Sequence, residues 1–311
     1  MADHRLHAPV LAWYSVEARD LPWRDPDCSP WGVLVSEVML QQTPVARVLP
    51  AWQRWVERWP TPASLADEAV GEAIHAWARL GYPRRAVRLH EAATAIVARH
   101  GGQVPDDLDQ LLALPGIGSY TAAAVASFAF RQRHAVVDTN VRRVLARTVT
   151  GVAQAAPSLT AAERALADDL VPDDAERAAT WAVASMELGA LICTARAPRC
   201  ADCPVIGLCR WQSDGAPAYD GPPRRGQRYE GSDRYVRGLL LAALRAAHGR
   251  RDDGGAAAGP LTQRALLAAV PDDALRDVVL DPHQRERCLD SLVADGLVEP
   301  LPRNRFRLPG Q

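Results

Sequence analysis

The sequence contains no lysine, so arginine supplies all 36 of its basic residues other than histidine. A chain without lysine has no side-chain amine that could form a Schiff base with an aldehyde. No apolar run reaches the roughly 18 residues that a membrane span needs. Residues 1–6 carry Asp3, His4 and Arg5 and lack the apolar segment of a secretion signal. We therefore expect a cytosolic protein with no contact to a membrane.

Basic charge is not in excess either, because the formal net charge is -1. The chain thus lacks the basic balance that many nucleic-acid-binding proteins show. Its arginines are clustered, and each cluster taken alone fits a solvated helix face as well as a binding site. The clusters are 84/85/88, 142/143/147 and 224/225/228. Their alanine- and arginine-rich context is typical of a GC-rich genome.

Alternating strand patterns are absent before residue 235, which predicts an all-helical region. Ser29 and Pro30 form a helix start, and the apolar run after them predicts a buried helix to Leu40. A second helix is expected to start at Pro44 and to carry Val48, Trp52 and Val56. Further helices are expected over 9–19, 62–66, 70–79, 84–100, 106–113, 119–129, 139–148, 160–170, 175–192, 236–247, 261–269 and 283–294. Residues 296–308 suggest a small β-ribbon.

Three regions follow from these patterns. A helical domain is expected over 1–212, a linker rich in Gly, Pro and Arg over 213–234, and a separate module over 235–311. Three helices and a ribbon make the last region similar to a winged-helix module, which is a likeness of fold alone.

A glycine hairpin, Leu114-Pro115-Gly116-Ile117-Gly118, lies between two predicted helices. Its glycines allow a tight turn that exposes backbone N–H groups, and the following helix adds its positive end. Such a turn can hold one phosphate of a nucleic acid without reading its sequence. A helix-turn-helix without any ligand remains the alternative.

Two carboxylates stand in unusual surroundings. Glu37 lies in an otherwise apolar helix, where burial raises the pKa of a carboxyl group. Asp138 precedes a helix as an N-cap, a position that stabilises helices and favours the ionised form. A protonated acid paired with an ionised carboxylate can cleave a glycosidic bond. An exposed Glu37 and a purely structural Asp138 are the alternatives.

Four of the six cysteines are close together, Cys193, Cys200, Cys203 and Cys209, with the spacing C-x6-C-x2-C-x5-C. In a cytosolic chain this clustering indicates metal ligation rather than disulfides. Structural zinc and a [4Fe–4S] cluster both remain open from the spacing.

Several of these motifs together resemble the MutY family of adenine DNA glycosylases, within the endonuclease III or helix-hairpin-helix-GPD superfamily. The resemblance covers roughly residues 8–212, and the run from Ser36 to Thr43, SEVMLQQT, is its most specific part. It is also carried by Leu21–Arg24, Leu80–Tyr82, the glycine hairpin, Val137–Val144 and the four-cysteine loop. It implies two helical lobes with DNA bound across their cleft, and a [4Fe–4S] cluster in the loop 193–209.

The resemblance also implies residue roles. Glu37 would protonate a flipped adenine, Asp138 would stabilise the sugar C1′, and Asn140 would orient Asp138. Tyr120 stands where some members place a catalytic tyrosine and where lyases of the superfamily place lysine. The implied adenine pocket comprises Arg24 and Leu40. The implied DNA contacts are Gln41, Gln42, Thr43, Tyr82, Leu114, Gly116, Ile117 and Gly118.

The expected function is therefore excision of adenine opposite 8-oxoguanine or guanine by a monomeric enzyme acting on double-stranded DNA at the bacterial nucleoid. Residues 235–311 do not resemble the 8-oxoguanine-sensing domain that many relatives carry. Two alternatives stay open, an endonuclease III-like glycosylase for oxidised pyrimidines and a non-catalytic iron–sulfur DNA-binding regulator. The absence of lysine disfavours the first, and the Glu37–Asp138 pair disfavours the second.

Overall fold

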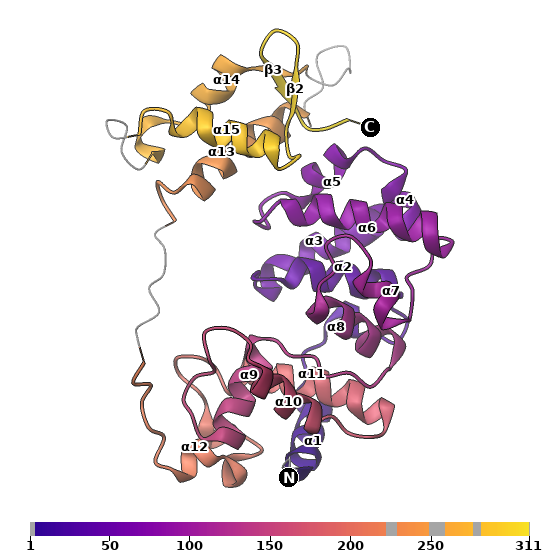
Figure 1. Cartoon of the computed structure of the whole chain (residues 1–311), viewed down its shortest axis with the longest axis vertical. Coiled ribbons are helices and arrows are strands. Elements are labelled where there is room, and N and C mark those ends of the chain that lie inside the picture. The colour runs from indigo at the N-terminus through magenta and orange to yellow at the C-terminus, as the bar shows by residue number, and fades with distance from the viewer. Residues whose placement is uncertain (1–3, 222–228, 249–258, 276–280, 311) are drawn as a thin grey trace. The chain divides into compact units, whose positions relative to one another are not determined.

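The computed structural model describes residues 4–221, 229–248, 259–275 and 281–310, which are largely helical (Figure 1). The helices that come before the cysteine loop are α1 (His7–Glu17), α2 (Pro30–Leu40), α3 (Val45–Arg58), α4 (Pro62–Ala66), α5 (Val70–Trp77), α6 (Arg84–His100), α7 (Leu108–Leu112), α8 (Ser119–Phe130), α9 (Thr139–Leu145), α10 (Ala161–Asp169) and α11 (Ala175–Leu191). The later elements are α12 (Arg210–Ser213), α13 (Asp233–His248), β1 (Leu261–Thr262), α14 (Gln263–Ala268), α15 (Gln284–Ala294), β2 (Glu299–Leu301) and β3 (Arg305–Arg307).

Most predicted helices are confirmed, and their ends follow local chemistry. The Ser29 side chain accepts a hydrogen bond from Gly32 N at 3.1 Å, with Pro30 as the first residue of α2. Gly101 ends α6 in a left-handed conformation with φ of 60°.

Two predicted helices were wrong in part. The helix expected over 139–148 gives way to a π-helical turn, Ala146–Thr150. Leu261–Thr262, expected to start a helix, is a strand because it pairs with β3.

The chain forms two compact units. The first unit comprises the described parts of Met1–Glu37, Pro105–Ala113 and Ile117–Pro223. Its core is apolar and lies where α1 and α9 pack against α11. Among its buried members are Leu6, Val10, Val144, Leu170, Trp181 and Leu188.

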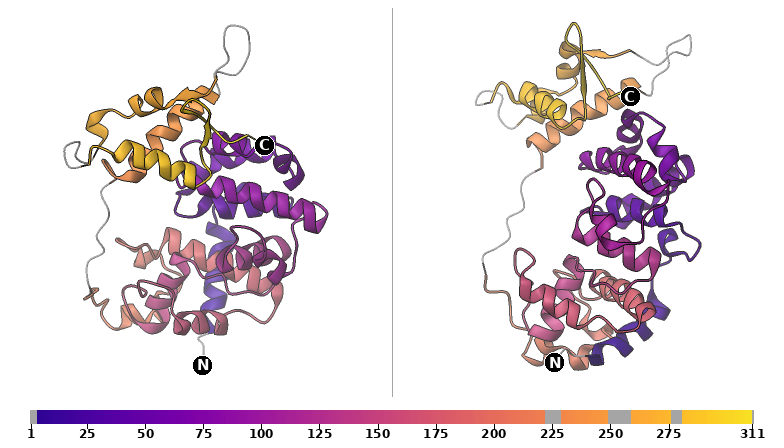
Figure 2. Two further views of the ribbon diagram at one scale, coloured as in Figure 1. Left: turned by 45° about the horizontal axis from the view of Figure 1, so that its top comes forward. Right: turned by 45° about the vertical axis from the view of Figure 1, so that its right-hand side comes forward.

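The second unit comprises the described parts of Val38–Val104, Leu114–Gly116 and Arg224–Gln311. In it, α4 and α5 pack on α6, and α13 packs on α14 and α15 (Figure 2). One buried cluster joins Ile74 of α5 to Val236, Leu240 and Leu244 of α13. The predicted boundaries at 212 and 235 remain a prediction, and residues 222–228 of the predicted linker lie outside the described residues.

A three-stranded antiparallel sheet with the order β1-β3-β2 completes the C-terminal region. Phe306 of β3 pairs with Leu261 on one side and Pro300 on the other. Just beyond β3, the Pro309 carbonyl accepts a hydrogen bond from Gly71 N at 3.0 Å. A side chain at position 71 would collide with that carbonyl, so glycine is required for this approach.

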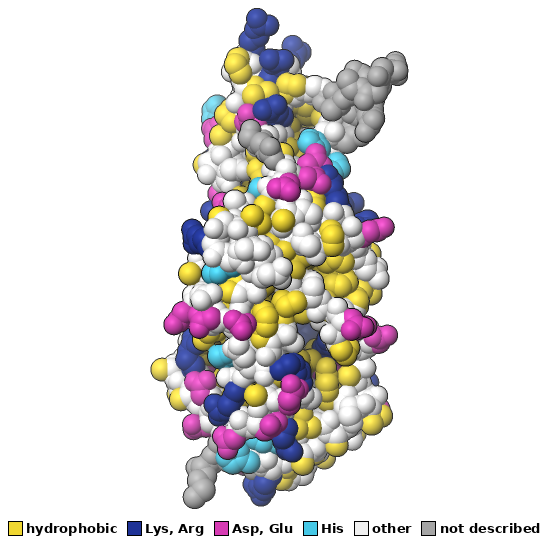
Figure 3. Space-filling view, turned by 90° about the vertical axis from the view of Figure 1, so that its right-hand side faces the viewer, with side chains coloured by type: hydrophobic (Ala, Val, Ile, Leu, Met, Phe, Trp, Pro, Cys, Tyr) yellow, Lys and Arg dark blue, Asp and Glu magenta, His cyan; other side chains and the backbone are white. Residues whose placement is uncertain are grey.

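No helix in the described part of the chain is long and apolar enough to cross a membrane. Acidic and basic side chains both appear on the face drawn in Figure 3, and they are interspersed in its lower part.

Candidate functional site

Glu37, which is buried, and Tyr120, which is half-buried, form a hydrogen-bonded pair in the first unit. Glu37 is 5% exposed because the rest of α2 is apolar and packed. The Tyr120 hydroxyl, on the first turn of α8, donates to Glu37 Oε2 at 2.9 Å. Burial raises the pKa of Glu37 to about 7, and the charge of Asp138 adds to the rise, while the hydrogen bond from Tyr120 and the charge of Arg24 oppose it. Glu37 is thus able to donate a proton near neutral pH.

Tyr120 itself stays a hydrogen-bond donor. Burial and the neighbouring charges of Glu37 and Asp138 raise the pKa of its phenol well above the usual value. A tyrosinate in this position is therefore excluded at neutral pH, and Tyr120 can act on Glu37 only through its O–H group.

Asp138 is the N-cap of α9, as predicted. Its Oδ1 accepts from the backbone N–H groups of Asn140 and Val141 at 2.8 and 2.7 Å, and its Oδ2 accepts from Asn140 Nδ2 at 2.7 Å. Burial nevertheless raises the pKa of Asp138, although these three hydrogen bonds favour the charged form. The capping bonds favour the ionised form, as expected for an N-cap, and desolvation opposes them.

Asn140 is held in turn by Arg143. The Arg143 guanidinium donates to Asn140 Oδ1 at 2.7 Å, to the Gly189 carbonyl at 2.6 Å and to the Cys193 carbonyl at 2.6 Å. These acceptors lie on α9, on α11 and at the first cysteine, and the Thr139 carbonyl is a further acceptor at 3.4 Å. The side chain of Asp138 is therefore oriented by a network that reaches the cysteine loop.

Gly189 allows α11 to approach the start of α9. A Cβ atom at position 189 would lie 2.7 Å from Asn140 Cβ and 2.8 Å from the Asn140 carbonyl oxygen. We expect Gly189→Ala to lower the free energy of unfolding by roughly 1–3 kcal/mol, because overpacking against a backbone cannot be relieved by a rotamer change. Denaturant unfolding measures this, with Gly207→Ala as the control, since a Cβ at position 207 meets nothing within 4 Å. Equal losses in both variants would contradict the prediction.

Glu187 is a buried carboxylate that the sequence analysis missed. It lies on α11 and is 0% exposed. Arg19 binds it in a bidentate manner at 2.7 Å to each oxygen, and Arg24 Nη2 donates to Oε2 at 2.7 Å. Burial alone would raise the pKa of Glu187, but the hydrogen bonds from Arg19 and Arg24 hold it at about 2. Its signal is an acid within the apolar second half of α11, which resembles the surroundings of Glu37 in α2.

Arg24 and Leu40 were expected to line an adenine pocket, and the Arg24 side chain is held in the first unit by its hydrogen bond to Glu187. It is fixed by Glu187, and its guanidinium lies 5.8 Å from the centre of the Tyr14 ring. Its charge also acts on Glu37. Leu40 lies in the last turn of α2, three residues beyond Glu37, and is half-buried.

The glycine hairpin joins α7 to α8, as predicted. Gly116 has φ of 73°, and a Cβ there would lie 2.6 Å from Arg88 Cβ. Leu114 and Ile117 are buried and anchor the turn. Gly118 is the N-cap of α8, and no side chain caps this helix. Backbone N–H groups at the start of α8 can therefore serve a phosphate.

Arg85 shapes two turns of the second unit. It is buried, and its guanidinium donates to the carbonyls of Gln41 and Gly81 at 2.7 and 3.0 Å and to Thr43 Oγ1 at 3.0 Å. Burial lowers the pKa of Arg85 to about 10. Thr43 is buried in this arrangement and supports the turn.

The same turns present two exposed residues. Gln42, at the end of α2, has φ of 52°, and Tyr82 has φ of 46° with 42% of its surface exposed. Both backbones are in the left-handed region, which is rare for residues other than glycine. Such strain is typical of functional turns.

The four clustered cysteines line one pocket together with Arg147 and Trp211. Arg147 Nη1 lies 3.4 Å from Cys193 Sγ, and Gln212 Nε2 lies 3.0 Å from Cys200 Sγ. These donors suit anionic sulfur, and the set of four thiolates suits iron or zinc. Among the described residues, no group of three or more His, Cys, Asp or Glu side chains is arranged to hold a single metal ion.

Comparison with known proteins gives consistent matches. A family model described as HhH-GPD superfamily base excision DNA repair protein matches residues 35–167. The adenine DNA glycosylase of Mycobacterium tuberculosis is 52% identical, over 97% of this chain and 93% of that protein. The adenine DNA glycosylase of Mycolicibacterium smegmatis is 50% identical, over 97% and 95%. Among solved structures, a thermostable thymine-DNA glycosylase has a TM-score of 0.61 at 28% identity, over 68% of this chain and 96% of that one.

Proposed function

The chain belongs to the adenine DNA glycosylases of the HhH-GPD superfamily of base excision DNA repair proteins, and from that premise we propose that it removes adenine mispaired with 8-oxoguanine or guanine. Adenine excision by hydrolysis of the N-glycosidic bond is the activity of the family. One observation carries the assignment of residues. The buried acid Glu37 accepts a hydrogen bond from the Tyr120 hydroxyl at 2.9 Å, in the same unit as the N-capping Asp138.

Glu37 and Asp138 have different roles in the proposed reaction. The adenine has to leave the base stack, because its reacting atoms are inaccessible within a duplex. Glu37 gives its proton to the flipped base, the bond from C1′ to the base breaks, and the electron pair leaves with adenine. The Asp138 carboxylate stabilises the positive charge at C1′. Water then adds to C1′ and returns a proton to Glu37. Asn140 and Arg143 orient Asp138.

Tyr120 tunes the acid in this scheme. Its hydrogen bond to Glu37 favours the charged carboxylate, so removing it raises the pKa of Glu37 above about 7. The rate of adenine release falls as pH rises through this pKa, because only protonated Glu37 is an acid. We therefore expect Tyr120→Phe to move the alkaline limb of the single-turnover pH profile to higher pH.

Tyr219→Phe serves as the control for this shift, since Tyr219 is an exposed tyrosine of the first unit. Its alkaline limb should coincide with that of the unsubstituted enzyme. A Tyr120→Phe profile that moves to lower pH would mean that Tyr120 is not a donor to Glu37.

DNA binding rests on the exposed turns. We infer that the N–H groups at Gly116 to Gly118 hold a phosphate near the flipped nucleotide, and that Gln42 and Tyr82 probe the duplex beside the opposite base. The exposed side chains and left-handed backbones of Gln42 and Tyr82 support the role proposed for these two residues. The enzyme is proposed to act as a monomer on double-stranded DNA at the nucleoid.

The four cysteines are proposed to hold a [4Fe–4S] cluster, as is typical of endonuclease III-like glycosylases. The cluster would fix the loop 193–209 and, through the Cys193 carbonyl and Arg143, the surroundings of Asp138. A visible charge-transfer band that disappears with Cys200→Ser supports iron; stoichiometric zinc without this band would refute the cluster.

The function is tested by incubating the protein with duplexes that carry one adenine opposite 8-oxoguanine, guanine or thymine, followed by alkali. Alkali-dependent cleavage at adenine in the first two duplexes, and none in the third, is the expected result. Binding without cleavage would favour a non-catalytic DNA-binding protein. Breaks without alkali would favour a lyase.

A further inference from the structure

The side chain of Tyr82 is contacted by a residue of the C-terminal region. Its hydroxyl oxygen accepts a hydrogen bond from Arg234 Nη1 at 3.0 Å, and the Arg234 guanidinium lies 5.8 Å from the centre of the Tyr82 ring. Arg234 belongs to the first turn of α13, 152 residues further along the chain. The backbone of Tyr82 is held separately, through the bond from Arg85 to the Gly81 carbonyl. Tyr82 is thus held at its hydroxyl by Arg234 and at its backbone by the turn that Arg85 supports.

Arg234 is itself oriented by aromatic contacts. Its guanidinium lies 5.0 Å from the centre of the Tyr229 ring, and Tyr229 packs edge-on against Tyr235 with ring centres 5.2 Å apart. A planar guanidinium between two tyrosines is a favourable cation–π arrangement. Tyr229 is 48% exposed and Tyr82 is 42% exposed, so both rings still offer surface to a partner.

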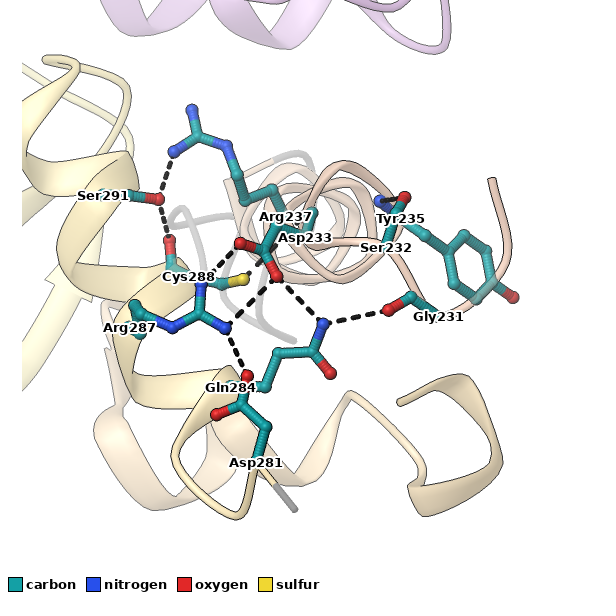
Figure 4. Close-up of polar contacts among 10 residues, drawn as sticks. All are labelled: Gly231, Ser232, Asp233, Tyr235, Arg237, Asp281, Gln284, Arg287, Cys288 and Ser291. Carbon is teal, nitrogen blue, oxygen red and sulfur yellow. Dashed lines mark hydrogen bonds and ion pairs between the residues drawn. The ribbon is translucent and has the colours of Figure 1, made fainter. Parts of the chain in front are cut away.

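Hydrogen bonds anchor the start of α13 to α15 (Figure 4). Gln284 is 1% exposed, and its Nε2 donates to the Gly231 carbonyl and to Asp233 Oδ1, both at 3.0 Å. Arg287 adds an ion pair to Asp233. The turn that carries Arg234 is therefore a rigid part of the C-terminal region.

The charge of Arg234 is not neutralised within the described part of the chain. Neighbouring arginines have carboxylate partners, with Arg237 bound to Asp295 and Arg285 to Asp272. Among the described residues, the hydrogen bond and the cation–π contacts of its guanidinium are with tyrosines. Its positive charge remains available to an anionic partner such as a DNA phosphate.

We propose that Arg234 is a positioning residue that holds Tyr82 for reading the base opposite the adenine, so that the C-terminal region takes part in mispair recognition. The proposal rests on the function proposed above and deepens it. The surface formed by Tyr82, Tyr229 and Arg234 takes the strand that carries 8-oxoguanine or guanine, with aromatic rings for a base and a cation for its phosphate. Bond cleavage itself is assigned to Glu37 and Asp138.

The test measures single-turnover adenine release opposite 8-oxoguanine and opposite guanine, and takes the ratio of the two rates. Arg234→Ala should lower this ratio about three- to tenfold, the loss expected for one hydrogen bond. Tyr82→Phe keeps the ring but removes the acceptor of that bond. Adding Arg234→Ala to Tyr82→Phe should therefore change the ratio less than Arg234→Ala does alone. Arg264→Ala, at an exposed arginine of the same region, is the control and should leave the ratio unchanged.

Each other outcome bears on the proposal. An unsubstituted enzyme without adenine release overturns the proposed function itself. An active enzyme whose Arg234→Ala variant keeps the ratio, or loses both rates alike, overturns the positioning role.

Discussion

Replacing Asp138 with asparagine is expected to reduce adenine release by at least about 10³-fold, because the positive charge that develops at C1′ loses its stabilising carboxylate. The fold should survive, since asparagine is as good an N-cap as aspartate. One contact changes. The Asn140 Nδ2 group would face the N–H group of the new side-chain amide at position 138. Turning the Asn140 amide to avoid this would disturb the hydrogen bond that Asn140 accepts from Arg143. Stability is therefore expected to fall by only about 1 kcal/mol.

Binding separates this loss from misfolding. The Asp138→Asn variant should still bind a duplex with adenine opposite 8-oxoguanine, as fluorescence anisotropy would measure. Asp174→Asn is the matched control, because Asp174 caps α11 of the same unit through one bond to Arg177 N at 2.9 Å. If Asp138→Asn retained adenine release within tenfold, Asp138 would be a structural cap and the mechanism would be wrong.

The second large effect is expected at Glu37. Glu37→Gln keeps the shape of the side chain and an acceptor for the Tyr120 hydroxyl, but it cannot give a proton to the departing base. Loss of a general acid costs about 10²–10⁴-fold in rate. The residual activity should also lose the alkaline limb that the pKa of about 7 imposes. Single-turnover rates on either side of neutrality measure both effects, and a variant that kept its alkaline limb would assign this limb to another group.

The same substitution should stabilise the protein at alkaline pH. The folded-state pKa of Glu37 is raised from 4.5 to about 7, so the folded state binds this proton more tightly than the unfolded state. Stability from this group therefore falls as pH rises from the unfolded value to the folded value, and the loss is complete above it. Above about pH 7, Glu37→Gln removes a buried charge and should raise the free energy of unfolding by an amount on the order of 1–3 kcal/mol.

Local signals account for the part of the fold that sequence predicted. Ser29 with Pro30 begins α2, and Gly101 ends α6, because capping depends on residues next to the helix end. The strand β1 and the π-helical turn at Ala146–Thr150 were missed for the opposite reason. Leu261 is a strand only because β3 lies beside it, 44 or more residues away in sequence.

In the candidate site too, local sequence indicates some residues and only the folded chain shows the others. Glu37 and Asp138 stood out because each is a carboxylate in an apolar or capping context. Glu187 had the same signal, but its two arginine partners lie 163 and 168 residues away in sequence, so its charge balance appears only in the folded chain. The contact of Arg234 with Tyr82 could not be predicted, since nothing near either residue indicates the other.

The close approach of Gly71 to Pro309 has an evolutionary consequence. Any larger residue at 71 collides with the Pro309 carbonyl, so the codon at 71 and the segment after β3 can change only together. Relatives that lack a C-terminal segment of this kind are free of this constraint and should accept larger residues at the equivalent of position 71. In lineages that keep the segment, glycine should persist at this position although it has no part in the chemistry.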